Sequence, residues 1–393
     1  MHIDVNNAFL SWSAVDLLNH GYKVDIRNIE SIIGGDESKR HGIVLAKSMV
    51  AKRRGVKTAE TIRDAKRKCN NLQIFPPNFE VYQNMSNKLF TYISKYTPDI
   101  QKLSIDECFI DYGKIKNLYG DPIKFAYRLK YEIKTKLGFT VNIGIANNKL
   151  CAKMASDFLK PDRVHTLFDN EIEKKMYPLP IEDLYGVGKS GSKKLRELNI
   201  NTIGELANAN YEYLYKYFKN QTNRLINSAK GIDDNIIMIR SKDVDGISNS
   251  TTLSYNLNYI EDIYKHLYPL VENVSMQLRN KKKYASVVTV TLKNKNFKTN
   301  SHQVKLKNPT SNTDEIFKVS KKLALELWDG EGIRLVGVGV SKLTNSVNYQ
   351  YSLFEEPKKV ENNTELDKVL DKLKTTYGNN IIKKASEYSN TKK

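Results

Sequence analysis

The chain contains 393 residues, of which 40% are hydrophobic, 10% are aromatic and 27% are charged. This length suits two to four domains of roughly 100–200 residues, and the hydrophobic content is sufficient for their cores, so wholesale disorder is excluded. No apolar run approaches the ~18 residues of a membrane span, and the first residues lack a signal-peptide pattern. We therefore expect an intracellular, cytoplasmic protein. Its three widely spaced cysteines predict neither a disulfide framework nor structural zinc.

The charge of the chain points to a polyanionic partner. Lys and Arg number 63 against 44 Asp and Glu, which gives a net charge of +19. A generically basic protein would also have such a total, so the distribution of charge matters more. Between Arg279 and Lys307 there are nine basic residues and no acidic one, whereas solvated surfaces normally mix both signs. This distribution favours nucleic acid as the partner.

Residues 1–165 show the order of elements that is typical of a split βαβ fold. We expect strands at 2–6, around 103–112 and at 139–146, and a helix with apolar residues four apart from Phe125 to Leu137. A basic stretch from Lys39 to Lys68, with eleven Lys and Arg residues against two acidic ones, interrupts this pattern. We interpret it as an insertion that covers the sheet and ends at Pro76-Pro77.

From Pro178 to about Gly231 the pattern changes to short helices separated by glycines. The segment Gly186-Val-Gly188-Lys189 is typical of a helix–hairpin–helix, in which free N–H groups at a helix start bind phosphate. An ordinary turn between helices is the alternative. The basic residues that follow, at positions 193, 194 and 196, favour the phosphate-binding interpretation.

Residues 243–345 predict a compact β-α-β-β-α-β domain. Strict alternation from Ser301 to Lys307 places Val304 and Leu306 towards a core, and Lys305 and Lys307 on the opposite, basic face of the sheet. We expect that face to contact phosphates. After residue 343 the pattern predicts a polar linker over 355–364 and one short helix over about 366–376.

Two acidic positions lie within apolar strand patterns. They are Asp4 and the pair Asp106-Glu107. A buried carboxylate needs a compensating charge, and two Mg²⁺ ions held by three carboxylates would provide it and support phosphoryl transfer. This interpretation requires a turn or strand end at Asp106, because neighbouring residues of a regular strand face opposite sides. Carboxylates satisfied by the backbone or by lysine are the alternative.

A series of motifs follows in order along about residues 1–345. They are Asp4-Val5-Asn6, Gly42 to Ala46, Ala51 to Thr58, Phe79 to Tyr82, Leu103 to Glu107, Gly144 to Lys153, Ala155 to Asp157 and Lys160-Pro161. In order and spacing these motifs resemble those of the Y-family, or translesion, DNA polymerases, and the start of the chain is most similar to the bacterial UmuC/DinB-like branch.

The resemblance implies an α+β, multidomain right-hand polymerase. Its parts would be a ferredoxin-like, split βαβ palm (1–11 and 76–165), small fingers (12–75), a helical thumb with the helix–hairpin–helix (166–240), a βαββαβ little finger (243–345) and a C-terminal tail (346–393).

The implied activity is template-directed, low-fidelity translesion synthesis, in which dNTPs are added to a primer 3′ end by two-metal phosphoryl transfer without proofreading. The family pattern makes Asp4, Asp106 and Glu107 the catalytic ligands of two Mg²⁺ ions, with the Val5 backbone near the second ion. Phe9 would pack against the sugar of the incoming nucleotide. Nucleotide-binding positions would be Met49 and Lys52, where the family usually has Tyr and Arg, and Lys160. The predicted DNA-binding residues are Gly186, Gly188, Lys189, Lys281, Lys282, Lys283, Lys305 and Lys307.

The pentapeptide from Gln350 to Phe354 resembles the bacterial sliding-clamp-binding peptide. In that peptide a Gln and a Leu-Phe pair dock into an apolar pocket, which assigns clamp binding to Gln350, Leu353 and Phe354. A tail that packs back on its own domain is the alternative. The expected partners are primer-template DNA, dNTP and the clamp, with no membrane, and we expect a monomer that acts in the SOS response to DNA damage.

Two other functions remain open at this point. One is a catalytically silent relative that keeps DNA and clamp binding and acts as a scaffold in damage tolerance. The other is a nucleotide cyclase, which a split βαβ palm with an acidic pair would also suit, although the helix–hairpin–helix and the clamp peptide count against it.

Overall fold

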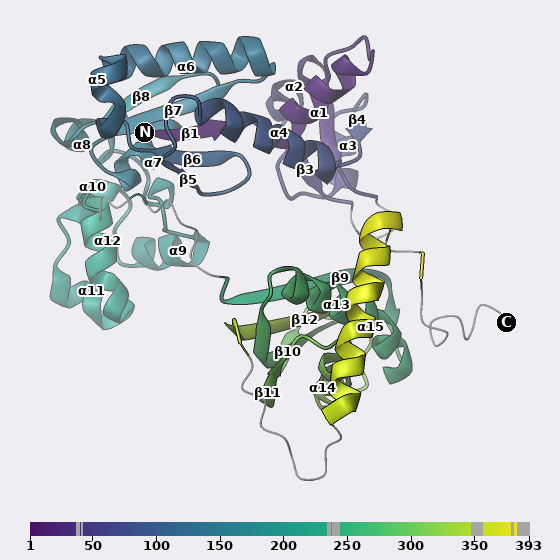
Figure 1. Cartoon of the computed structure of the whole chain (residues 1–393). Coiled ribbons are helices and arrows are strands. Elements are labelled where there is room, and N and C mark those ends of the chain that lie inside the picture. The colour runs from purple at the N-terminus through teal and green to yellow at the C-terminus, as the bar shows by residue number, and fades with distance from the viewer. Residues whose placement is uncertain are drawn as a thin grey trace. The chain divides into compact units, whose positions relative to one another are not determined.

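The computed structural model describes residues 1–36, 40, 42–233, 237, 244–346, 357–378 and 381–382 (Figure 1). The chain forms two compact units, residues 1–36 with 42–241 and residues 37–41 with 242–393. The predicted clamp peptide, with Gln350, Leu353 and Phe354, lies outside the described residues.

A five-stranded sheet forms the centre of the first unit, with its strands in the order β5-β6-β1-β7-β8. All neighbouring strands are antiparallel except β7 and β8. Ile3, Val5 and Cys108 belong to the same hydrophobic core. His2 and Asp4 alternate with Ile3 and Val5 along β1, so their side chains lie on the opposite face. The strands are β1 (His2–Val5), β5 (Ile100–Lys102), β6 (Glu107–Ile110), β7 (Val141–Ala146) and β8 (Val164–Leu167).

Two long helices cover the apolar face of this sheet. They are α4 (Phe79–Ile93) and α6 (Pro122–Leu137), which contribute Leu89 and Leu129 among others to the core. On the other face, α7 (Lys149–Asp157) packs directly against β7. Gly144 makes this approach possible, because a Cβ there would come within 1.9 Å of the Ala152 carbonyl oxygen.

The basic insertion builds a sheet of its own, which corrects the expectation that it covers the main sheet. Strands β2 (Ser31–Gly34), β3 (Val44–Lys47) and β4 (Gln73–Phe75) pair in the order β3-β2-β4. With α2 (Met49–Arg53) and α3 (Ile62–Lys68) they enclose a small separate core. Helix α1 (Ala8–Asn19) packs on this sheet and connects it to β1. Strands of three or four residues are too short to give a clear alternating pattern.

The remainder of the first unit is helical, as the glycine spacing predicts. Gly186 has a φ of +93°, a left-handed conformation that glycine adopts without strain, and Gly188 caps the N-terminus of α9. One hydrophobic core joins these short helices to α7. The helices not yet named are α5 (Lys116–Tyr119), α8 (Ile172–Lys175), α9 (Lys189–Glu197), α10 (Ile203–Ala207), α11 (Tyr211–Phe218) and α12 (Thr222–Ala229).

The second unit confirms the predicted β-α-β-β-α-β order. Its sheet runs β11-β10-β12-β9 and is antiparallel throughout. Leu306 packs on the core as expected, but Val304 remains 40% exposed because β11 is an edge strand. The elements are β9 (Gly246–Leu257), α13 (Ile260–Asn280), β10 (Tyr284–Asn294), β11 (Thr299–Thr310), α14 (Thr313–Leu327) and β12 (Ile333–Thr344).

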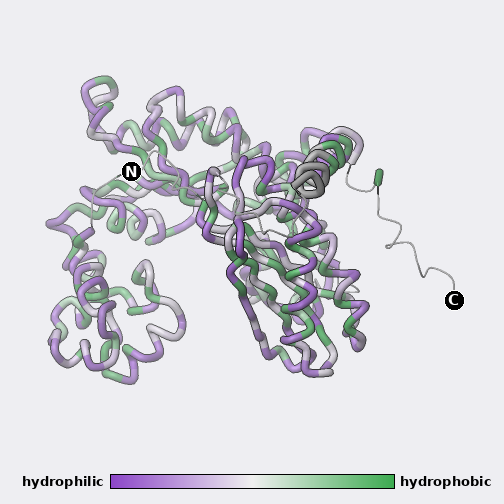
Figure 2. The backbone as a smooth tube through the Cα atoms, turned by 60° about the horizontal axis from the view of Figure 1, so that its bottom comes forward, coloured by the Kyte–Doolittle hydropathy of each residue, from purple (hydrophilic) through white to green (hydrophobic). Residues whose placement is uncertain are grey.

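The C-terminal segment differs from the prediction. Helix α15 spans Pro357–Tyr377, so most of the expected linker over 355–364 is helical and the expected short helix is only its second half. This helix packs against α13 (Figure 1). Hydrophobic and hydrophilic residues alternate closely along the tube in Figure 2, and none of the described helices is long and apolar enough to span a membrane.

Candidate active site and nucleic-acid interface

Asp4 and Glu107 lie directly opposite each other on neighbouring strands. The register of β1 and β6 pairs Asp4 with Glu107, so both side chains project from the same face of the sheet. β6 begins at Glu107, which leaves Asp106 in the preceding turn, where the Ser104 hydroxyl donates a 2.5 Å hydrogen bond to its carboxylate. The Val5 N–H donates to the Asp106 carbonyl at 3.1 Å. The turn at Asp106 that the metal hypothesis requires is therefore present.

Two lysines from α7 and its C-terminal loop lie among these carboxylates. The Lys153 Nζ is 3.1 Å from Glu107 Oε2, 3.8 Å from Asp4 Oδ2 and 3.5 Å from Asp157 Oδ2. The Lys160 Nζ is 3.1 Å from Asp4 Oδ2 and 2.7 Å from Asp157 Oδ1. The positive charge that buried carboxylates need thus comes from a helix that follows β7 in the chain.

The surroundings shift the pKa values of the two carboxyl groups in opposite directions. Burial raises the pKa of Asp4 to about 7, although Lys160 opposes this effect. The neighbouring His2 holds the pKa of Glu107 down, to about 2, and Lys153 acts in the same direction against burial. An additional cation close to Asp4 would favour its ionised form, because an opposite charge lowers the pKa of a carboxyl group.

The oxygen donors fit a hard divalent cation, since carboxylates are the ligands that Mg²⁺ prefers. Within the described ranges, however, no three His, Cys, Asp or Glu side chains are grouped so that they could hold a metal ion. Lys153 and Lys160 interact with the carboxylates instead. The assignment of Asp4, Asp106 and Glu107 as a joint metal site therefore remains a prediction.

The loop that carries Lys160 is fixed by asparagine side chains. Asn142 on β7 donates to the carbonyls of Ser156 and Leu159 at 2.9 and 2.8 Å. Asn6 in turn donates to the Asn142 side chain at 3.0 Å and accepts from the Asp162 N–H at 2.8 Å. These buried and partly buried hydrogen bonds hold the segment on both sides of Lys160 against the acidic face of the sheet.

Phe9 follows β1 on the first turn of α1 and lies over α4. Its ring stacks on Tyr82 with centroids 4.6 Å apart and an interplanar angle of 22°, and it is half-buried. Met49 and Lys52 are exposed on α2, with Met49 43% exposed. The described contacts do not join Phe9, Met49, Lys52 and Lys160 into one group, so their shared role towards a nucleotide remains a prediction.

The predicted phosphate-binding hairpin has suitable local geometry. Gly186 and Gly188 form the turn before α9, and Lys189 is the first residue of that helix. All three residues are exposed. The first N–H groups of a helix have no partner within the helix, so the turn offers donors to an anion.

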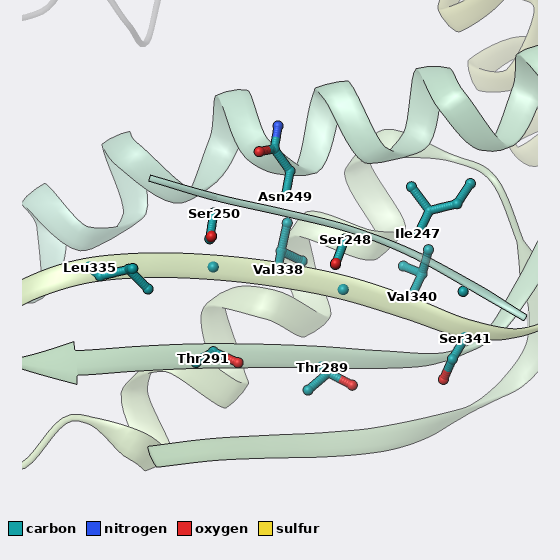
Figure 3. Close-up of a pocket in the computed structure, with 13 residues that line it drawn as sticks. Ile247, Ser248, Asn249, Ser250, Thr289, Thr291, Leu335, Val338, Val340 and Ser341 are labelled. Atoms are coloured by element: carbon teal, nitrogen blue, oxygen red, sulfur yellow. The ribbon is translucent and has the colours of Figure 1, made fainter. Parts of the chain in front are cut away.

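The outer face of the second unit's sheet forms a shallow trough of about 620 Å³ (Figure 3). Small hydroxyl side chains line it, and Gly337 and Gly339 leave it open between the strands. Lys305, which pairs with Val287, and Lys307 lie on this same face of β11, whereas Lys281, Lys282 and Lys283 occupy the turn before β10. The hydroxyl residues are Ser248, Ser250, Thr289, Thr291 and Ser341.

Sequence reasoning missed the residues around the carboxylates. Lys153 and Asp157 lie within the family motifs, but the pattern alone assigns a role neither to them nor to His2 and Ser156. One signal was available. His2 precedes Asp4 by two residues on a strand, so both must share one face, and Lys153 and Asp157 are four apart on a helix.

Three parts of the chain match models of one protein family. Residues 3–157 match the impB/mucB/samB family, residues 245–353 match the C-terminal domain of that family, and residues 169–200 match its HHH motif. A protein of Clostridium acetobutylicum named DNA polymerase IV is 45% identical over 97% of this chain and 96% of its own length. A second protein of that name, from Acetivibrio thermocellus, is 33% identical over 96% of this chain and 94% of its own.

Solved structures show the same fold. A chimera of the Y-family DNA polymerases Dbh and Dpo4 superimposes with a TM-score of 0.75 at 23% identity, covering 88% of this chain and 99% of the chimera. The predicted fold class and family resemblance are therefore confirmed. With near-complete coverage by relatives at this level of identity, the chain belongs to the impB/mucB/samB family of bacterial Y-family DNA polymerases.

Proposed function

We propose that this translesion DNA polymerase transfers nucleotides from dNTPs to a primer 3′ end through Asp4, Asp106 and Glu107, which hold two Mg²⁺ ions. The observation that carries the proposal is the register of β1 and β6, which places Asp4 opposite Glu107 on the same side of the sheet, beside the turn with Asp106. Polymerases of this family use divalent metal ions. The Mg²⁺ ions would lower the pKa of the primer hydroxyl and neutralise the triphosphate.

The chain's own residues would bind and orient the substrates. Lys160, which now neutralises Asp4, is 37% exposed on its side chain and sits at the edge of the acidic face. An incoming triphosphate would compete with Asp4 and Asp157 for this ammonium, a compact charge that suits phosphate. Phe9 would pack against the sugar, and Met49 and Lys52 would lie along the triphosphate.

DNA would be held by two surfaces that recognise its backbone. In the first unit this is the hairpin of Gly186, Gly188 and Lys189, through free N–H groups and charge. In the second unit it is the outer face of the sheet with Lys305 and Lys307, together with the lysines of the 281–283 turn. Contacts of this kind are independent of sequence and sensitive to salt.

Recruitment to the replication fork would use the clamp peptide, with Gln350, Leu353 and Phe354 as its anchors. The support for this step is the motif itself. Two adjacent large apolar residues, three positions after a glutamine and soon after the last strand of the domain, fit a peptide that fills an apolar pocket on a partner.

The catalytic assignment is tested by Asp106→Ala and Glu107→Ala. Each should abolish primer extension in Mg²⁺ while DNA binding changes by only about threefold, because the metal ligands act on the transition state and the DNA contacts are spread over many residues. Extension and filter binding on one primer-template measure both quantities.

The control for these variants is Glu80→Ala, since Glu80 is an exposed carboxylate in the first turn of α4 and should be dispensable. Near wild-type extension by either active-site variant would refute the assignment. Absence of extension by the unmodified chain itself would favour the silent scaffold, which the named polymerase relatives do not support.

A further inference from the structure

One oxygen of Glu107 is approached by basic side chains from two different elements. Lys153 Nζ on α7 lies 3.1 Å from Glu107 Oε2, and His2 Nε2 on β1 lies 3.6 Å from the same oxygen. The histidine contact is an electrostatic one rather than a hydrogen bond at this distance. His2 is fully buried, and its Nε2 is one of the few buried side-chain atoms in the described part of the chain without a hydrogen-bond partner.

The other side of the His2 ring is anchored. Its Nδ1 lies 2.8 Å from the Ser156 hydroxyl, and the ring contacts Phe109 with centroids 4.7 Å apart. The Ser156 hydroxyl has a single proton and two acceptors in reach, the Lys153 carbonyl at 2.7 Å and His2 Nδ1. A carboxylate beside Nε2 favours the tautomer with the proton on Nε2; Nδ1 then accepts from Ser156, whose hydroxyl proton turns from the Lys153 carbonyl to the ring.

We propose that His2 is a positioning residue for the catalytic carboxylate, which it orients through a chain from the Ser156 hydroxyl to the imidazole to Glu107. Ser156 on α7 sets the rotation of the ring, and the ring directs its Nε2–H at Glu107 Oε2. Lys153 approaches the same oxygen from α7, so the carboxylate is held between helix and strand. The inference rests on the proposed role of Glu107 as a metal ligand.

This arrangement matters because a ligand acts through its orientation. Groups that hold a metal ligand in place typically change metal affinity or activity by about 10–100-fold when they are removed. Glu107 is the first residue of β6, so the strand continues on only one side of it. Contacts from other elements, such as His2 and Lys153, therefore contribute most to the orientation of its side chain. Phe109, two residues further along the same face, packs against the His2 ring and keeps it in place.

Two amide substitutions separate the two sides of the ring. His2→Asn keeps a polar group near Nδ1, within reach of Ser156, but has nothing at the Nε2 position. His2→Gln places an N–H near Nε2. We expect His2→Asn to weaken Mn²⁺ binding and lower kcat by about 10–100-fold with little change in KM for dNTP, and His2→Gln to stay within about threefold of the parent.

Mn²⁺ is the only metal ion in the binding measurement. Electron paramagnetic resonance detects its binding to the full chain in the presence of primer-template and a non-hydrolysable dNTP. Single-turnover extension supplies kcat and KM. Ser156→Ala, which frees the ring, should weaken Mn²⁺ binding in the same direction as His2→Asn and serves if that variant folds poorly. His20→Asn, on an exposed histidine at the end of α1, is the matched control and should change neither quantity.

Equal behaviour of His2→Asn and His2→Gln, or unchanged Mn²⁺ affinity in both His2→Asn and Ser156→Ala, would overturn the proposal and reduce His2 to a packing residue. Glu107→Ala is measured in parallel to keep the two proposals apart. If Glu107→Ala remains active, the metal-ligand assignment fails. If it is inactive while His2→Asn matches the parent, only the positioning role fails.

Discussion

Phe9 illustrates how a single ring can serve packing and substrate selection together. One face of the ring stacks on Tyr82, and the Tyr82 hydroxyl is within 3.1 Å of the buried Ser13 hydroxyl. Phe79, which is 64% exposed, meets the ring edge-on with centroids 6.3 Å apart. The half-buried Phe9 is thus supported from one side by α4 and remains partly open, as a ring that packs against a sugar has to be.

Replacing Phe9 by Ala should raise the use of rNTPs relative to dNTPs by about 100-fold while synthesis with dNTPs persists. A flat ring against C2′ excludes a 2′-hydroxyl by contact and leaves it without a hydrogen-bond partner, and a methyl group does neither. Competition between each rNTP and its dNTP on one template gives the ratio directly.

Phe79→Ala is the matched control, because it removes a neighbouring exposed ring of the same size and leaves Phe9 itself in place on its Tyr82 support. Its sugar ratio should match that of the parent. If Phe9→Ala instead unfolds at a lower temperature and loses both activities with an unchanged ratio, Phe9 is a core residue and the selection of the sugar lies elsewhere.

The candidate site was only partly predictable from residue patterns. Asp4 and Glu107 stood out because a charge inside an apolar strand is unusual, and the local sequence is enough to see this. Their compensation by Lys153 and Lys160 depends on how closely α7 approaches β7, which Gly144 permits and which no local pattern encodes. Contacts between residues about 50 or 150 positions apart are set by packing rather than by periodicity.

Helices and strands could be predicted from the sequence where they bury an apolar face in a shared core. The β-α-β-β-α-β order of residues 246–344 followed from long strands and amphipathic helices with a shared core. The first half of helix α15 has the composition of a linker, because charged and polar residues dominate there. Helices held by ion pairs instead of an apolar stripe give no periodic signal of this kind.

Ion pairs attach helix α15 to helix α13, through Arg279 with Asp367 and Asp371 and through Lys374 with Glu272. The side chain of Arg279 is 8% exposed and binds both oxygens of Asp371, Nη2 to Oδ1 at 2.7 Å and Nε to Oδ2 at 2.5 Å. Asp367 accepts from Arg279 at 3.2 Å and from the Thr313 N–H at 3.1 Å, at the start of α14. Arg279 therefore belongs to this attachment and not to the basic surface with which its sequence neighbours are grouped.

Asp371→Ala should release α15, because buried Arg279 then loses its bidentate partner and keeps only the longer contact to Asp367, and breaking a buried ion pair costs up to about 3–5 kcal/mol. Hydrogen exchange of residues 366–377 should then approach the rate of an unprotected chain, while the strands β9, β10 and β12 keep their protection. Lys372→Ala, on the same helix, is the control and should leave that exchange unchanged. Equal protection of α15 in the parent and in Asp371→Ala would show that other contacts hold the helix.

For the whole molecule, the excess of 19 positive charges explains a general affinity for DNA but does not locate it. Within the second unit, the structure separates two groups of lysines that could bind DNA. Lysines occur on both sides of its sheet, with Lys305 on the outer face and Lys318 and Lys322 on α14. Helix α14 packs on the core, so its lysines and those of β11 belong to opposite layers of the domain. This separation allows charge and position to be tested independently.

Neutralising Lys281, Lys282, Lys305 and Lys307 with Gln should weaken DNA binding about equally on all sequences. The slope of log K against log salt should also fall, by up to about one unit for each phosphate that the protein no longer neutralises. The physical reason is that each bound phosphate releases a condensed counterion, so removing a lysine that binds a phosphate changes the salt dependence as well as the affinity.

The control is the pair Lys318→Gln and Lys322→Gln, which removes charge from α14 and should leave the slope close to that of the parent. Titrations of one fluorescent primer-template over a range of salt concentrations measure all the slopes. An unchanged slope in the first set, or an equal effect per residue in both sets, would show that total charge and not the outer face of the sheet determines DNA binding.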